Sequence, residues 1–321
     1  MKKIALVAAL AAVSASAFAQ SSVTLWGRIN TTVESQKFGD NDRKVVVQDN
    51  RSRLGVKGQE DLGGGLKVSF ALEHGFNVDS GKQTSGSFWN RESSVQLSGS
   101  FGAVRIGNWT NGSYFATADY VSMHNHDTGT SDDALYSGAG WTTSNKVGYF
   151  TPNIDGFTAE ITMHAGEGAD KRATDLSVNY DQGPLHLGAG FSKAGNAKQY
   201  AGRALYEMGE FTVGGYIQRE DVGGVTRNIV RLSGMYTMGA SEFHVNFGNS
   251  GDFKGMSDSG AKQLTLGYNY NLSKRTKVYG FYTMIDNKAN GSFGPSAIAT
   301  GDSLPKGKDF NSLAVGVRHN F

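Results

Sequence analysis

Residues 264–272 read Leu-Thr-Leu-Gly-Tyr-Asn-Tyr-Asn-Leu, and in this stretch every second side chain is apolar or aromatic. Alternation with a period of two indicates a β-strand with two chemically different faces. The last nine residues, 313–321, repeat the pattern as Leu-Ala-Val-Gly-Val-Arg-His-Asn-Phe. Residues 66–73 and 157–164 alternate in the same way, and no helical period of comparable length follows residue 23. The pattern predicts an all-β protein.

The composition of the chain excludes several classes of protein. Of the 321 residues, 44 are glycine, 4 are proline and none is cysteine. The lack of cysteine excludes a disulfide scaffold and a zinc–thiolate site. No stretch reaches the ~18 consecutive apolar residues that a membrane-spanning helix needs. A membrane protein built from such helices is therefore excluded, whereas one built from strands is not.

The N-terminus has the features of a secretory signal peptide. Lys2 and Lys3 precede an apolar run over residues 4–13, and Ala17-Phe18-Ala19 matches the small-x-small cleavage pattern. We therefore expect residues 1–19 to be cleaved and residues 20–321 to form a single exported β-barrel domain. Removal of both lysines from the 31 basic residues leaves 29, equal to the 29 acidic ones. Such a balance gives no electrostatic support for binding nucleic acid.

Links of two lengths separate the predicted strands. Seven are tight and rich in turn residues, such as Asp181-Gln182-Gly183-Pro184, and eight are longer and polar. Fifteen links join sixteen strands, and closing so large a sheet removes its edges. A soluble sandwich is the alternative, but small uncharged polar residues on one face and continuous apolar residues on the other favour a transmembrane barrel. The longer links lie near residues 34–50, 77–90, 110–144, 167–173, 193–199, 220–226, 249–261 and 287–309.

The sequence also resembles a known family. Residues 53–67, Arg-Leu-Gly-Val-Lys-Gly-Gln-Glu-Asp-Leu-Gly-Gly-Gly-Leu-Lys, are similar to the second strand, turn and third strand of the general diffusion porins of the beta-proteobacterial outer membrane. The resemblance implies an antiparallel sixteen-stranded homotrimer with its third external loop folded into the lumen. It also implies contact with outer-membrane lipids and lipopolysaccharide, and recognition of the terminal strand, which ends at Phe321, by the barrel assembly machinery. Further matches lie at residues 90–91, 101–107, 145–152, 183–185, 268–276 and 315–321.

The longest link, residues 110–144, is the expected constriction loop. A link of about 35 residues needs a role of its own, and a sixteen-stranded barrel leaves an aqueous bore that such a loop can narrow. We expect its negative charge to come from four aspartates, Asp119, Asp127, Asp132 and Asp133.

A basic wall is expected opposite this loop. Alternation places Arg53, Lys57, Arg105 and Lys146 on the lumen face, and Arg28 and Arg51 are added to them. The resemblance assigns Arg91 to the constriction, although alternation from Val95 places it on the lipid face; a bulge or a position above the membrane would reconcile the two. Gly148 stands where family members often have arginine, which weakens the basic cluster. Facing charges of opposite sign produce a transverse field, and an excess of positive charge predicts a mild preference for anions.

Other functions remain open at this stage. A substrate-specific porin needs aromatic side chains along the lumen, where Trp26 is the clear candidate. An outer-membrane hydrolase needs a nucleophile motif, and neither an HExxH motif nor a G-x-S-x-G motif in a hydrolase context occurs. His124, His126 and Asp127 could hold a metal, but such pairs in polar loops are mostly empty. We expect a passive, water-filled channel for small hydrophilic solutes and ions, with no catalytic residue, cofactor or metal.

Overall fold

The computed structural model describes residues 22–122, 129–168, 171–295 and 304–321. Within these residues, no helix is both long and apolar enough to cross a membrane. The helical segments in this part of the chain are three short turns, α2 (Gly112–Tyr114), η1 (Phe115–Asp119) and η2 (Gly129–Ser131). The strands are β1 (Ser22–Phe38), β2 (Lys44–Asp49), β3 (Arg53–Gly63), β4 (Leu66–Gly75), β5 (Glu92–Gly99), β6 (Gly102–Asn108), β7 (Lys146–Phe150), β8 (Phe157–His164), β9 (Ala173–Gln182), β10 (Leu185–Ala194), β11 (Ala197–Met208), β12 (Phe211–Val222), β13 (Val225–Met238), β14 (Ser241–Ser250), β15 (Ala261–Asn271), β16 (Thr276–Asn287) and β17 (Phe310–Asn320).

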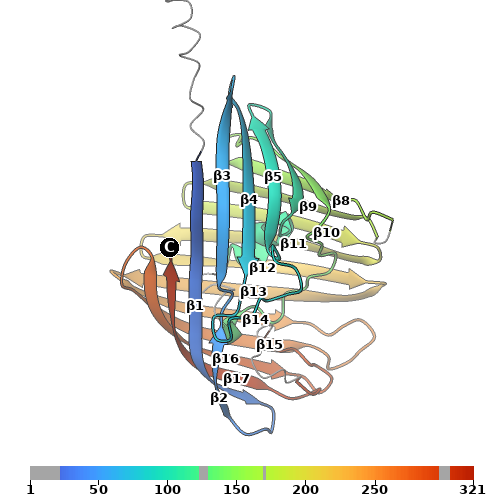
Figure 1. Cartoon of the computed structure of the whole chain (residues 1–321). Coiled ribbons are helices and arrows are strands. Elements are labelled where there is room, and N and C mark those ends of the chain that lie inside the picture. The colour runs from blue at the N-terminus through green and yellow to red at the C-terminus, as the bar shows by residue number, and fades with distance from the viewer. Residues whose placement is uncertain (1–21, 123–128, 169–170, 296–303) are drawn as a thin grey trace, which may run out of the picture.

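The strands form one closed antiparallel barrel (Figure 1). From β3 onward each strand pairs with its neighbours in sequence, and β17 pairs with β1 to close the sheet. Both β2 and β3 pair with β1, so they are two halves of one barrel strand. The interruption between them contains Arg51, whose φ of 62° lies in the left-handed region that side chains rarely adopt. The seventeen ladder segments therefore make sixteen barrel strands, which confirms the predicted architecture.

The two faces of the wall differ as the alternation predicts. In β15, Leu266, Tyr268 and Tyr270 point outward and are exposed, whereas Thr265 and Asn269 point inward and are buried. In water such an outer surface would cost the free energy of hydrating each apolar side chain. In a bilayer it is the lipid-facing surface, and the polar side chains line the interior.

Three of the predicted long links were predicted with the wrong length and are short in the structure. The link over residues 34–50 shrinks to 39–43, because β1 continues to Phe38 and pairs with β2. The links near 193–199 and 220–226 are two-residue turns at 195–196 and 223–224. Gly195, Gly223 and Gly224 all have positive φ, which tight hairpins need. The polar residues around these turns still pair between neighbouring strands, so a polar sequence by itself did not indicate a loop.

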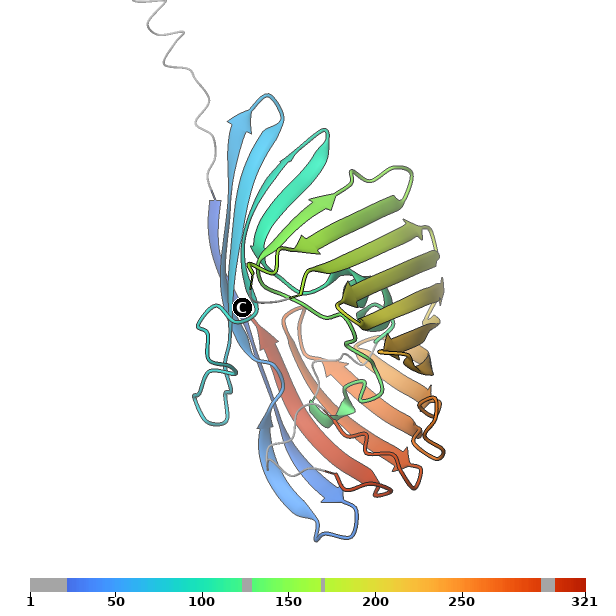
Figure 2. The same cartoon turned by 90° about the vertical axis from the view of Figure 1, so that its right-hand side faces the viewer.

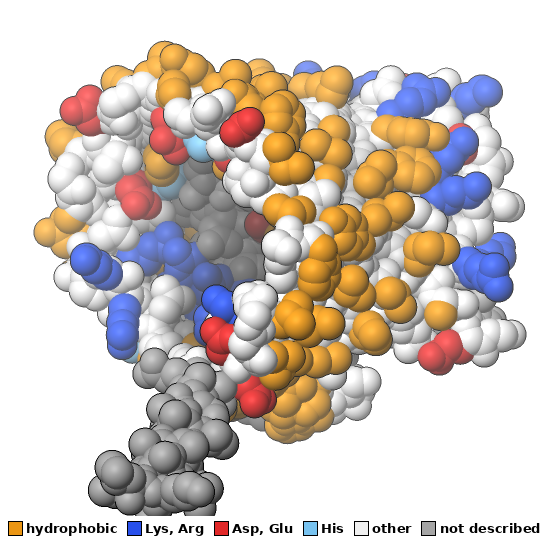
Figure 3. All heavy atoms as spheres, turned by 90° about the horizontal axis from the view of Figure 1, so that it is seen from above, with side chains coloured by type: hydrophobic (Ala, Val, Ile, Leu, Met, Phe, Trp, Pro, Cys, Tyr) orange, Lys and Arg blue, Asp and Glu red, His pale blue; other side chains and the backbone are white. Residues whose placement is uncertain are grey.

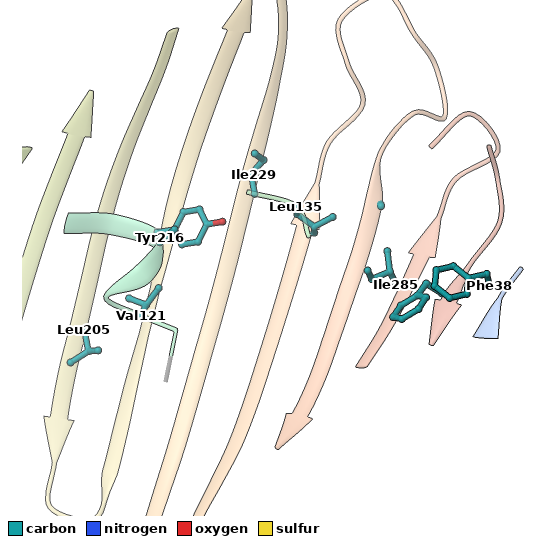
Figure 4. Packing of buried hydrophobic residues seen from close by; sticks show 10 residues of the cluster. Phe38, Val121, Leu135, Leu205, Tyr216, Ile229 and Ile285 are labelled. Atoms are coloured by element: carbon teal, nitrogen blue, oxygen red, sulfur yellow. The ribbon is translucent and has the colours of Figure 1, made fainter. Parts of the chain in front are cut away.

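The long link after β6 folds into the barrel, as predicted (Figure 2). We call its described residues, 109–122 and 129–145, the inward loop. Val121 and Leu135 of this loop are fully buried and belong to one apolar cluster with wall residues such as Leu205 and Ile229 (Figure 4). The hydrophobic core of the described residues therefore lies between the inward loop and the wall.

Candidate channel constriction

A cavity of about 760 Å³ lies between the inward loop and the wall formed by β1 and β3–β8. Figure 3 looks into the hollow of the barrel and shows Lys and Arg side chains gathered on its wall. The wall contributes the arginines to the cavity, and the loop contributes aspartates and aromatic residues. The charged lining residues are Arg28, Arg51, Arg53, Arg91, Arg105, Glu73, Glu92, Glu160, Asp119, Asp132 and Asp133.

Arg91 reaches the lumen through an irregularity at the start of β5. Glu92 is paired with Glu73 on the lumen face of β4, and the Arg91 backbone N–H donates to the Glu73 carbonyl oxygen as well. Two successive residues thus face one residue of the partner strand, which is how a bulge re-aims a side chain. The Arg91 side chain then forms an ion pair with Glu73. Simple alternation from Val95 fails at this point for that reason.

Glutamates on the same wall partly neutralise the positive charge of the arginines. The Glu73 carboxylate accepts from Arg91 and also lies 3.5 Å from Nη1 of Arg53. Glu92 Oε1 lies 3.6 Å from Nη1 of Arg105. Two glutamates therefore compensate three arginines on β3–β6, and a net positive charge remains there.

Gly148 has a structural role at the residue paired with Arg105. A Cβ atom at Gly148 would lie 2.9 Å from Cζ2 of Trp109, so a larger residue would push the indole away. The Arg105 guanidinium lies over the rings of Trp109, at 5.5 Å, and Phe150, at 4.7 Å. Contacts of this kind hold a cation in a fixed orientation. The space beside Gly148 is used by the indole that supports Arg105.

The aspartates of the inward loop face the same cavity. The Oδ1 atom of Asp133 lies 2.8 Å from Nη1 of Arg231, and Tyr216 donates its hydroxyl to Oδ2. The Asp133 carboxylate also accepts the backbone N–H groups of Leu135 and Tyr136. Asp133 therefore fixes the loop to β12 and β13, besides carrying charge. Asp119 and Asp132 line the cavity too.

The remaining predicted site residues lie elsewhere. Lys57 lines a separate hollow with Arg105, and its ammonium lies 6.0 Å from the Trp26 ring. Lys146 is buried under the start of the inward loop, where Nζ donates to the Trp109 carbonyl at 3.1 Å and to Oδ1 of Asn111 at 3.0 Å. Neither lysine lines the main cavity. Asp127, with His124 and His126, lies outside the described residues.

Aromatic residues of the inward loop were not predicted as part of the site. The rings of Tyr114 and Phe115 are 5.5 Å apart, and Tyr114 also contacts Trp141 at 5.2 Å and Tyr136 at 5.3 Å. All four residues line the cavity. Strand alternation singles out Trp26 alone, whereas the density of aromatic residues between 109 and 141 is the feature of the sequence that indicates these side chains.

The chain ends at the closure of the barrel. The backbone N–H groups of Gly27 and Phe321 each donate to the carbonyl of the other residue, both at 3.1 Å. The terminal residue therefore extends the β17–β1 ladder by one pair beyond Asn320.

A closed sixteen-stranded barrel with an apolar outer wall, a charged lumen and an inward loop defines a channel of the bacterial outer membrane. The chain belongs to the Gram-negative porin family, which it matches over residues 5–290. It is 32% identical to outer membrane porin protein 32 of Delftia acidovorans, over 100% of both chains. An outer membrane porin protein of Bordetella pertussis is 27% identical, over 98% of this chain and 77% of that protein.

A solved structure is similar as well. The anion-selective porin from Comamonas acidovorans superimposes with a TM-score of 0.80 at 28% identity, over 94% of this chain and 100% of that one. The family and the fold together identify the protein as an outer-membrane porin and point to a channel rather than an enzyme.

Proposed function

We propose that small hydrophilic solutes and ions diffuse through this channel with a mild preference for anions. The observation that carries the proposal is the arrangement of charge, with five arginines on the wall facing aspartates of the inward loop across one cavity. Such an arrangement produces a transverse field, which low-dielectric walls concentrate in the water between them. The selectivity of the Comamonas porin is a further support for the sign of the preference.

The preference is expected to be mild because the charges nearly balance. Among the residues that the structure describes, the cavity lining holds five arginines and six carboxylates. Two of the carboxylates have partners that reduce their influence on passing ions. Asp133 pairs with Arg231, and Glu160 interacts electrostatically with the Lys146 ammonium, so two cations outside the lining offset these two charges. The arginines on the open wall then outweigh the remaining acids by a small margin.

Charge reversal at Arg53 tests this proposal. Arg53→Glu places an acid beside Glu73, so the reversal potential in a salt gradient should shift toward cation preference. Lys274→Glu is a matched control, because Lys274 lies exposed in the turn between β15 and β16. Both variants are measured in planar bilayers beside the original chain. A reversal potential that Arg53→Glu leaves unchanged would contradict the assignment of Arg53 to the conduction path.

The proposal extends to the assembly of the channel. Residues 1–19 would be removed on export, and the barrel assembly machinery would recognise β17 together with Phe321. The mature chain would form a homotrimer in contact with outer-membrane lipids and lipopolysaccharide. The apolar outer wall and the backbone pairing of Phe321 with Gly27 support this route. No catalytic residue, cofactor or metal is assigned to the channel.

A further inference from the structure

An aromatic surface faces water inside the channel. It consists of Tyr114, Phe115, Tyr136 and Trp141, which we call the aromatic platform, and its rings form a continuous series of contacts. Phe115 is 50% exposed and Trp141 is 36% exposed. Apolar side chains exposed to water lose the free energy that burial would provide. The same loop buries Val121 and Leu135 completely, so it can bury apolar side chains and leaves Phe115 and Trp141 exposed. The exposure of Phe115 and Trp141 therefore points to a passing solute as their contact.

The opposite side of the cavity offers a different chemistry. Arg53, Arg91 and Arg105 line it, and Glu73 and Glu92 are the two carboxylates among these three guanidinium groups. A guanidinium group binds a carboxylate through parallel N–H donors, with defined geometry. One side of the cavity thus suits a carboxylate, and the other suits the face of a ring.

We propose that the constriction is a subsite for aromatic monocarboxylates, molecules of the benzoate type. The ring would stack on the aromatic platform while the carboxylate lies toward the arginines of β3–β6. This inference rests on the proposed function, because it names the solute class that the same cavity favours. Binding must be weak enough for release, since a conducting site has to let its occupant leave.

Three probes separate the parts of the recognition. Benzoate has both the charge and the ring, cyclohexanecarboxylate has the charge and a similar size without an aromatic face, and benzyl alcohol has the ring without the charge. Each is added to potassium chloride during planar-bilayer recording of the full-length protein, and the concentration that halves the chloride conductance is measured. We expect benzoate to act at about two- to tenfold lower concentration than cyclohexanecarboxylate, the range of aromatic pair contacts. Benzyl alcohol should act more weakly than either acid.

Substitutions locate the effect on the aromatic platform. Phe115→Leu and Trp141→Leu keep an apolar side chain and remove the aromatic face. The ratio of the half-blocking concentrations of cyclohexanecarboxylate and benzoate should therefore fall toward one. Phe88→Leu is the matched control, because Phe88 is an exposed aromatic residue in the link before β5, outside the cavity lining. It should keep the full ratio. Chloride conductance of each variant shows that its channel is intact.

The outcomes distinguish this inference from the proposed function. Equal potency of the two acids on the original chain, or an unchanged ratio in both platform variants, would overturn the aromatic subsite while leaving the channel proposal in place. A channel without any preference for chloride over potassium would instead overturn the proposed selectivity.

Discussion

The ion pair between Arg231 and Asp133 should control how firmly the inward loop is held. Its two side chains are 2% and 1% exposed, with 2.8 Å between Nη1 and Oδ1. Arg231→Met would leave the Asp133 carboxylate buried without its cation, a change that costs about 3–5 kcal/mol. The equilibrium between attached and detached loop would then shift by a factor of roughly 150 to 4,000 toward detachment.

Single-channel recording measures this shift directly. A loop that leaves the wall moves in the lumen, so Arg231→Met should show higher open-channel noise and frequent partial closures. Adding Asp133→Asn should restore much of the quiet conductance, because no buried charge remains and the amide oxygen can still accept the N–H groups of Leu135 and Tyr136. Arg227→Met is the control, since it breaks the buried pair with Glu220, away from the inward loop.

The reasoning fails under either of two results. Noise in Arg231→Met that equals that of the original chain would mean that the ion pair does not hold the loop. Noise in the double variant that equals or exceeds that of Arg231→Met would mean that the unpaired buried carboxylate is not the cause.

Two further predictions concern packing and assembly. Gly148→Arg should lower the free energy of unfolding of the barrel by about 1–3 kcal/mol, because its Cβ would meet the Trp109 ring. The loss caused by Gly148→Arg should be smaller in a Trp109→Ala background than in the original chain, and an equal loss in both backgrounds would refute the packing argument. Deletion of Phe321 should reduce the yield of heat-resistant trimer, since it removes the last backbone pair with Gly27, and an unchanged yield on gels of unheated samples would exclude that role.

The barrel could be predicted from the sequence because lipid imposes a simple rule. A strand such as β15 must present an apolar side chain at every second position, and the period survives without knowledge of its neighbours. The rule weakens beyond the bilayer, where both faces meet water. The hairpins at 195–196 and 223–224 lie in such polar sequence, which is why they were predicted as longer links.

The constriction could be predicted only in part, because distant contacts set the path of the loop. Thr130 donates to Glu34 at 2.7 Å, and the Ala134 N–H donates to Gln263 at 3.1 Å, across 96 and 129 residues of sequence. No local pattern encodes such pairings. The bulge at Arg91 is likewise a property of two strands together. The aromatic platform was visible as composition, but its contacts depend on how the loop folds back on itself.

Most attachment points of the inward loop lie on the half of the barrel opposite the wall arginines, and the exceptions include the hydrogen bonds from Thr130 to Glu34 of β1 and from Trp109 to Glu160 of β8. Hydrogen bonds and ion pairs join the loop to β9, β12, β13 and β15, whereas four of the arginines stand on or beside β3, β5 and β6. Substitutions of charged residues on one half of the barrel can therefore change the solute selectivity of the channel without weakening most contacts that hold the inward loop on the other half. Solute selectivity and the attachment of the inward loop can therefore evolve largely independently of each other.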